Sequence, residues 1–135
     1  MKRILIFLGV IVVIFSAVAI LTNTQTNDGE TVESVTPGEL QSKIDNGGPV
    51  TVYFYSEDCT YCQQTTPVVV PMTEDMGIDL QIYDVKQYEQ GWDDFEINGT
   101  PTIVHFENGE ETARIEGYHE EDVFRQWFEE EVLHK

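Results

Sequence analysis

The chain has 135 residues, 41% of them hydrophobic, which suits one globular domain with a short segment attached. Its formal net charge at pH 7 is −18, and residues 22–135 contain all 25 acidic residues but only five of the seven basic ones. Such an acidic surface repels nucleic acid and anionic lipid and keeps the domain soluble. The composition therefore argues against nucleic-acid binding. It leaves two interpretations of the charge, a strongly solvated surface or adaptation to salty or alkaline surroundings.

The first 21 residues are predicted to be a membrane anchor or a signal segment. Lys2 and Arg3 precede residues 4–21, a run of eighteen residues without a charge, which is just long enough to cross the hydrocarbon of a bilayer. The next charged residues are acidic, so the positive-inside rule places the N-terminus in the cytoplasm and the rest of the chain outside. We therefore expect a single-pass protein of the cell membrane with an extracytoplasmic domain.

A cleaved signal peptide is the alternative interpretation of this segment. Residues 17–19 read Ala-Val-Ala, which resembles a small-residue cleavage site after an apolar stretch. Against cleavage, Ile20 and Leu21 continue the apolar run past the proposed cut. Both interpretations export the domain. Residues 22–31 are polar and are predicted to form a flexible tether, so the folded domain should occupy residues 32–135.

Strand and helix signals alternate along this domain, which predicts an α/β fold. The first helix should follow Thr36, which with Glu39 forms a capping-box pattern around Pro37, and it should end at residues 46–48. The last helix should bury Phe124 and Phe128, with Trp127 and Val132. Further expected elements are strands at 31–35, 49–55 and 78–84, helices at 59–76 (bent at Pro67 and Pro71), within 86–96 and at 119–133, and a hairpin of 102–106 and 112–116 around Asn108-Gly109.

The two cysteines stand in the segment Cys59-Thr60-Tyr61-Cys62, where a polar turn after an apolar run should lead into a helix. Residues three apart share a helical face, so the two thiols can close a small disulfide ring or bind one metal ion. The unpaired N–H groups and the dipole of a helix start favour a thiolate at the first cysteine, and thiolate is the nucleophile of disulfide exchange. The segment therefore indicates a dithiol redox centre.

The cysteine pair has two further interpretations at this point. One is a purely structural disulfide, and the other is half of a metal site, although no second Cys or His pair has ligand spacing. We expect no metal. Because the chain has only these two cysteines, no separate structural disulfide can form within it. Outside the reducing cytoplasm the pair can persist in its oxidised form.

Several features in the same order and spacing resemble the thioredoxin superfamily over residues 35–133. They are the Cys59–Cys62 motif, Pro67 five residues after it, Gly99-Thr100-Pro101-Thr102, the turn at 106–110, and Gly117. The resemblance implies a thioredoxin-like fold, with a central mixed β-sheet flanked by helices. It also implies a redox-active disulfide as the only redox group, with no further cofactor.

The same resemblance assigns roles to individual residues. Cys59 would be the exposed nucleophile and Cys62 the residue that resolves the mixed disulfide. Pro101 would be cis and lie beside the first cysteine, and the backbone of Thr100 would pair with the substrate chain. Thr60 and Tyr61 would tune the redox potential. A threonine before the cis-proline looks more like oxidising or isomerising members of the superfamily than like cytoplasmic reductases.

Two positions depart from the family pattern. Tyr53, which should lie in the core, stands where many thioredoxins carry a buried aspartate, and Asp58 stands where tryptophan is common. The Asp58 carboxylate should raise the pKa of Cys59, against the effect of the helix dipole, and the sequence does not decide between the two. Asp58 is therefore a further candidate for redox tuning.

The remaining polar and aromatic residues each have two interpretations. Glu57 is either a proton relay for Cys62 or a solvated turn residue, and His105 is expected in packing or at the surface rather than in catalysis. His119 should begin the last helix. Tyr88 and Trp92 either line a partner groove or extend the core.

Taken together, the sequence predicts a membrane-tethered thiol–disulfide oxidoreductase that acts on exported cysteine-containing proteins, with a membrane redox partner as one option. The alternative is a non-catalytic thioredoxin-like binding, chaperone or secretion accessory module. Substrates and the direction of electron flow stay open.

Overall fold

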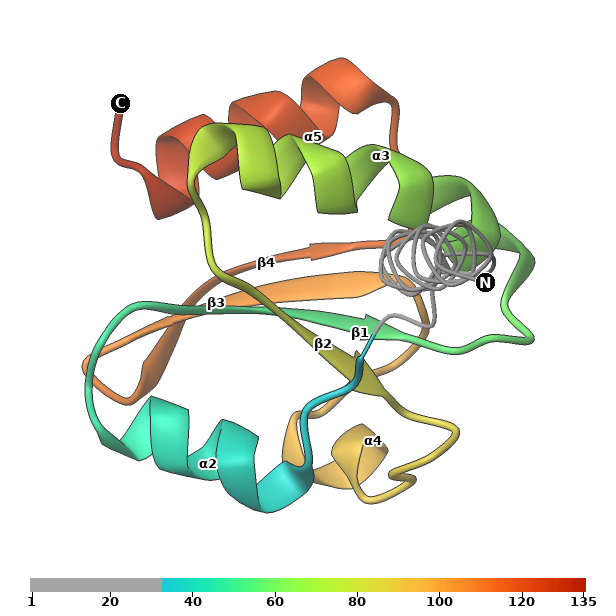
Figure 1. Ribbon diagram of the computed structural model, residues 1–135, viewed down its shortest axis with the longest axis vertical. Coiled ribbons are helices and arrows are strands. Elements are labelled where there is room, and N and C mark those ends of the chain that lie inside the picture. Colours follow the sequence, from blue (N-terminus) through green and yellow to red (C-terminus); the bar gives the residue numbers. More distant parts are fainter. Residues whose placement is uncertain (1–32) are drawn as a thin grey trace, which may run out of the picture. The chain divides into compact units, whose positions relative to one another are not determined.

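The computed structural model describes residues 33–135, which form a four-stranded sheet with helices on both faces (Figure 1). The strand order is β2-β1-β3-β4. The central strand β1 (Val50–Tyr55) runs parallel to β2 (Leu80–Asp84) and antiparallel to β3 (Thr102–Glu107), which pairs in turn with β4 (Glu110–Glu116). This is the mixed sheet that the family resemblance implies.

The helices divide between the two faces of the sheet (Figure 1). One face carries α2 (Pro37–Asp45) and the short α4 (Gly91–Asp94). The other carries α3 (Thr60–Met76), which connects the parallel strands β1 and β2, and α5 (Glu121–Trp127), which continues as the π-helix η1 (Phe128–Val132). The described domain is therefore a three-layered α/β/α arrangement.

Local sequence signals explain most of the element boundaries. At α2 the Thr36 side chain accepts a hydrogen bond from the Glu39 N–H, while the Glu39 carboxylate accepts one from the Thr36 N–H, so the predicted capping box is present. Asn108 and Gly109 both have positive φ, 54° and 83°, which is typical of a tight two-residue hairpin turn. This turn lets β3 and β4 start pairing at Glu107 and Glu110, so β4 begins earlier than predicted.

Three further predicted boundaries were wrong. Residues 33–36 form no strand: Val35 makes a single backbone hydrogen bond, 2.8 Å to the Ile82 carbonyl, and the rest of the predicted segment lies outside the described residues. The strand predicted from residue 78 begins at Leu80, because α3 first has to end through Gly77, whose φ is 71°. The last helix begins at Glu121 rather than His119, whose imidazole Nε2 lies 3.0 Å from the Glu116 carbonyl oxygen of the preceding strand.

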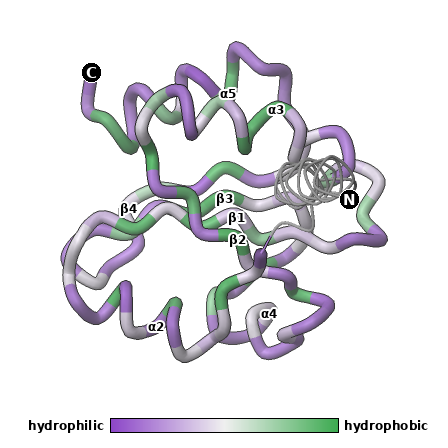
Figure 2. The backbone as a smooth tube through the Cα atoms, in the orientation of Figure 1, coloured by the Kyte–Doolittle hydropathy of each residue, from purple (hydrophilic) through white to green (hydrophobic). Residues whose placement is uncertain are grey.

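The core consists of two clusters, one on each face of the sheet, and hydrophobic residues concentrate in the strands (Figure 2). The cluster beneath α2 contains Leu40 and Ile44, as predicted, and the partly buried Tyr88 and Trp92 pack against it. Those two aromatic residues therefore extend the core. The opposite cluster lies beneath α3 and α5 and contains Tyr53, Val69, Met72, Ile82, Ile103, Phe124 and Phe128.

His105 is a packing residue, as expected. It is fully buried in β3, and its Nδ1 lies 2.9 Å from the Thr51 hydroxyl on the neighbouring strand β1. Burial lowers the pKa of its imidazole, which favours the neutral ring. The residue therefore joins the two strands and has no contact with the cysteines that would give it a catalytic role.

The predicted membrane segment and tether, residues 1–31, lie outside the described residues. Among residues 33–135 no helix has the length and hydrophobicity needed to cross a bilayer.

Gly91 supplies a stability test of the packing between α4 and the sheet. A Cβ atom at this position would overlap Cε1 of the buried Tyr83 ring and lie 3.0 Å from its Cζ. We expect Gly91→Ala to lower the free energy of unfolding by about 1–3 kcal/mol, because the core must shift to accept the methyl group. Chemical denaturation measures this change.

Gly38→Ala is the matched control, because Gly38 lies in α2 and a Cβ atom there would meet nothing within 4 Å. It should leave the domain unchanged or stabilise it by up to about 1 kcal/mol, since alanine is the better helix former. Equal stabilities of the two variants would contradict the packing argument.

Candidate active site

Cys59 lies at the junction between β1 and α3, where the sequence places it. It is the N-cap residue of α3, and its Sγ accepts a hydrogen bond of 3.1 Å from the Cys62 backbone N–H. A side chain normally occupies this position as an oxygen acceptor for the unpaired N–H groups of the first turn. Here the acceptor is sulfur. Cys59 is half-buried, whereas Cys62 is 1% exposed, and both are free thiols.

The loop before β3 faces the Cys59 sulfur. The Thr100–Pro101 peptide bond is cis, and the Cys59 thiol donates a hydrogen bond of 3.3 Å to the Thr100 carbonyl. Two hydrogen bonds of 2.8 Å fix this loop, one from the Thr102 hydroxyl to the Gly99 carbonyl and one from the Gly117 N–H to the Pro101 carbonyl. Residues about forty positions apart in the chain therefore meet at one sulfur atom.

Opposing effects set the pKa of Cys59. Partial burial raises it, but hydrogen bonds from the side chains of Cys62 and Thr100 and from the backbone N–H groups of Cys62 and Tyr61 lower it further than burial raises it. The net pKa lies below the ordinary value of a cysteine. The hydrogen bonds at the helix start therefore lower the pKa of Cys59 on balance, a direction that the sequence left open.

Cys62 behaves in the opposite way. Burial, together with the hydrogen bond to the Cys59 side chain, raises the pKa of its thiol to about 11. The two thiols of one short motif thus differ in acidity, with Cys59 the easier one to ionise. This is the division that an attacking and a resolving cysteine require.

Asp58 is turned towards a cation rather than towards the thiols. Its carboxylate forms an ion pair of 2.6 Å with Lys86, which follows β2, and both side chains are largely exposed. The pair raises the pKa of Lys86, chiefly through the hydrogen bond that its ammonium group donates to the Asp58 carboxylate. A neutralised carboxylate has less effect on its sequence neighbour Cys59.

The two residues between the cysteines are exposed at the start of α3. Tyr61 is 60% exposed, and its ring stacks on that of Tyr118, with centroids 6.2 Å apart and planes at 26°. Tyr118 follows Gly117, the residue that is bonded to the Pro101 carbonyl. The helix start and the cis-proline loop are thus bordered by one aromatic pair.

A hydroxyl network beneath Cys62 was not predicted from the sequence. Tyr53 is fully buried, which confirms its place in the core, but its hydroxyl also lies 2.9 Å from the Thr66 Oγ1 and 3.5 Å from the Cys62 carbonyl oxygen. Thr66 stands four residues after Cys62 and so shares its helical face, which is the signal that could have indicated the network.

Glu57 fits the interpretation of a solvated turn residue. Its side chain is exposed in the turn, and its backbone carbonyl accepts a hydrogen bond from the Gln63 side chain. Within residues 33–135 no three His, Cys, Asp or Glu side chains converge as metal ligands would.

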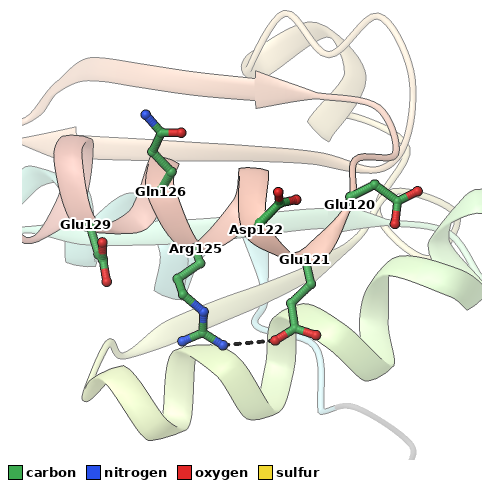
Figure 3. A pocket seen from close by; sticks show the side chains of 6 residues that line it. All are labelled: Glu120, Glu121, Asp122, Arg125, Gln126 and Glu129. Carbon is green, nitrogen blue, oxygen red and sulfur yellow. Dashed lines mark hydrogen bonds and ion pairs between the residues drawn. The ribbon is translucent and has the colours of Figure 1, made fainter.

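A separate hollow runs along α5, and none of the predicted site residues lines it (Figure 3). Four carboxylates and one cation line it, and Arg125 pairs with Glu121 at 2.9 Å. It contains no thiol or other strong nucleophile, so the cysteine pair remains the candidate active site. The residues that line the hollow are Glu120, Glu121, Asp122, Arg125, Gln126 and Glu129.

Comparison with known proteins gives a consistent result. A family model described as a thioredoxin-like domain matches residues 36–131. The chain is 32% identical over 71 residues to "Thioredoxin Y, chloroplastic" of Oryza sativa subsp. japonica, covering 51% of this chain and 42% of that protein. It is thus matched to less than half the length of the rice protein. It is 23% identical over 86 residues to a thioredoxin of Rickettsia bellii, covering 62% of this chain and 82% of that protein.

Solved structures show the same fold. A mutant thioredoxin from Halobacterium salinarum superposes with a TM-score of 0.63 at 25% identity, covering 73% of this chain and 88% of that chain. The oxidised thioredoxin of Plasmodium falciparum superposes with a TM-score of 0.63 at 22% identity, covering 74% of this chain and 97% of that chain. Homology and the Cys59–Cys62 geometry together support thiol–disulfide oxidoreductase activity, and the chain belongs to the thioredoxin-like domain family.

Proposed function

We propose that this protein is a thiol–disulfide oxidoreductase that exchanges disulfides with exported, cysteine-containing proteins through Cys59 and Cys62. One observation supports it above the others. A half-buried sulfur with a lowered pKa caps α3, a second thiol lies directly behind it in the first turn, and the carbonyl of Thr100 lies 3.3 Å in front. These are the parts that exchange needs: an accessible nucleophile, a resolving thiol and a backbone edge for the partner chain.

The exchange follows from these positions. The Cys59 thiolate attacks one sulfur of a partner disulfide, that S–S bond breaks, and the leaving sulfur departs as a thiolate that takes up a proton. Cys62 then attacks the Cys59 sulfur, which releases the second partner thiol and leaves a Cys59–Cys62 disulfide. The same steps run in reverse when the oxidised pair meets a partner dithiol. The relative reduction potentials of the two pairs decide the direction.

The choice of exported substrates rests on the first part of the sequence. The charge-free run of residues 4–21, with Lys2 and Arg3 before it and acidic residues after it, favours an anchor with the domain outside the cytoplasm. In such a compartment partner proteins form disulfides, which gives a dithiol enzyme its substrates. The strongly acidic composition further favours partners that are not nucleic acids.

Substitution of each cysteine in turn tests this function. We expect Cys59→Ser to abolish insulin-disulfide reduction, because no accessible thiolate remains. Cys62→Ser should instead accumulate mixed disulfides between Cys59 and partner proteins, since the resolving thiol is gone. Non-reducing electrophoresis followed by mass spectrometry detects these adducts.

The two variants also separate the proposal from its alternative, a non-catalytic binding module. The Tyr61–Tyr118 pair, 60% and 38% exposed, would offer such a module a contact surface. Partner binding that persists in Cys59→Ser, with no adducts in Cys62→Ser, would favour the binding module.

Asp58 and Lys86 form, in our proposal, a tuning pair for Cys59. Removing the cation by Lys86→Ala leaves an unpaired carboxylate beside Cys59, which should raise the pKa of the thiol. At pH values below the pKa of Cys59, the variant should have a smaller thiolate fraction than the unsubstituted protein, and its alkylation by iodoacetamide should be about twofold slower. Well above the pKa of Cys59 the two alkylation rates should be equal. The pH dependence of the alkylation rate shows both limits.

Asp58→Asn is the matched control for this pair. It removes the carboxylate itself, so alkylation should be as fast as in the unsubstituted protein or faster, and adding Lys86→Ala to it should change nothing further. A high salt concentration should shrink the effect of Lys86→Ala, because both groups are exposed. An unchanged rate in Lys86→Ala at low salt would contradict the tuning role.

The proposed location has its own test. Full-length protein expressed in a bacterial host should sediment with the membranes, and external protease should digest the domain in spheroplasts but not in intact inverted vesicles. Recovery of the domain in the medium would indicate cleavage after residue 19 instead. Protection from external protease in spheroplasts would contradict export.

A further inference from the structure

The resolving step requires Cys62 to ionise. The hydrogen bonds that lower the pKa of Cys59 do not supply this. Cys62 attacks as a thiolate, yet its side chain is 1% exposed, and burial raises its pKa to about 11. Attack by Cys62 therefore depends on the groups around its sulfur and on what they do when the proton leaves.

The surroundings of Cys62 offer hydroxyls rather than carboxylates. The titratable groups that face it are Cys59 from the start of α3 and Tyr53 and Tyr55 from β1, while Thr100 approaches from the cis-proline loop. In the part of the chain that the structure describes, no carboxylate is hydrogen-bonded to Cys62. Among the described residues, therefore, no hydrogen-bonded carboxylate is in place to act as a general base for Cys62.

The direction of the hydrogen bonds around Tyr53 can be worked out. The Thr66 hydroxyl has one proton and donates it to the Cys62 carbonyl at 2.8 Å. Its contact of 2.9 Å with Tyr53 is therefore one in which the phenol donates. The Tyr53 hydroxyl also lies 3.5 Å from the Cys62 carbonyl oxygen, and the Cys62 thiol contributes to the raised pKa of the phenol. The Tyr53 hydroxyl thus contacts the backbone turn that carries the Cys62 thiol.

Tyr53 is a donor here and not a base. Burial, the largest cause, raises the pKa of Tyr53 far above its ordinary value, so the phenol keeps its proton at every pH at which the domain works. When Cys62 ionises, the O–H can turn from Thr66 to the sulfur, and a hydrogen bond to a charged acceptor is stronger than one to a neutral acceptor. This change of hydrogen-bond acceptor, from Thr66 to sulfur, stabilises the Cys62 thiolate.

We propose that Tyr53 is a positioning residue for resolution: its hydroxyl holds Cys62 towards Cys59 and donates a hydrogen bond to the Cys62 thiolate as it attacks. This inference rests on the proposed oxidoreductase function. In the step, the Cys62 S–H bond breaks and a Cys62–Cys59 S–S bond forms. The bond between Cys59 and the partner sulfur breaks with its electron pair on the partner, which takes up the proton released by Cys62. The cysteine pair is oxidised and the partner disulfide is reduced to two thiols.

Stopped-flow kinetics can follow the two steps separately. Reduced protein mixed with an aromatic disulfide reagent releases one coloured thiolate when Cys59 attacks and a second when Cys62 resolves the mixed disulfide. We expect Tyr53→Phe to slow the second phase about tenfold near neutral pH and to leave the first within about twofold. The pH profile of the second phase should shift to higher pH, because the Cys62 thiolate has lost its donor.

Tyr83→Phe is the matched control. Tyr83 is also fully buried, lies on the adjacent strand β2, and its hydroxyl has no hydrogen-bond partner among the described residues. Its loss should leave both phases unchanged. A second measurement avoids turnover altogether: in a Cys59→Ser background, alkylation of Cys62 against pH should show a higher pKa with Phe than with Tyr at position 53.

The outcomes separate this inference from the function on which it rests. A second phase with unchanged rate and pH profile in Tyr53→Phe would overturn the positioning role. Slowing without a shift of the profile would overturn it as well, since that result indicates altered packing alone. Absence of the first phase in the unsubstituted protein would instead contradict the oxidoreductase function.

Discussion

The hydrogen bond from the Cys62 N–H to the Cys59 sulfur, 3.1 Å long, is the contact on which the active site depends. It makes a thiol the N-cap of a 17-residue helix, so the same N–H groups that the helix leaves unpaired stabilise negative charge on sulfur. The geometry holds only while β1 delivers the chain to this point and α3 continues from it. The fold and the reactivity of Cys59 therefore have the same origin.

The two thiols show how position within one helical turn decides the pKa of a cysteine. Cys59 sits at the rim, where hydrogen bonds outweigh partial burial and lower its pKa. Cys62 lies three residues further in, against the sheet, where burial dominates and its pKa rises to about 11. No charged residue is needed for this contrast. It arises from the depth at which the helix start meets β1, which the packing of α3 on the sheet sets.

Three of the five lysine and arginine side chains of the described domain form ion pairs with carboxylates. Lys86 pairs with Asp58, Arg114 with Glu111 and Arg125 with Glu121, at 2.6, 2.6 and 2.9 Å. Exposed pairs of this kind add little to stability. The pair at Asp58 differs from the other two in its position, because that carboxylate is the sequence neighbour of Cys59. In the proposed tuning role, pairing with Lys86 limits the effect of the carboxylate on the thiolate.

The sequence by itself determined the fold class, the order of the elements and the central role of the cysteine pair, because capping residues, alternation and turn residues act locally. The capping box at Thr36 and Glu39 and the turn at Asn108-Gly109 were predicted from such signals and are present. The strand expected at residues 31–35 was not found in its described part, where tertiary pairing amounts to one backbone hydrogen bond.

Only the tertiary structure decided the chemistry around the sulfurs. The sequence left the pKa of Cys59 open between the helix start and Asp58, and the hydrogen bonds that Cys62, Tyr61 and Thr100 make with its sulfur lower it. It likewise marked Tyr53 as core without indicating that its hydroxyl reaches Thr66 and Cys62. These contacts join residues that are distant along the chain. Their distances follow from how α3 and the loops pack on the sheet, and no local pattern encodes that packing.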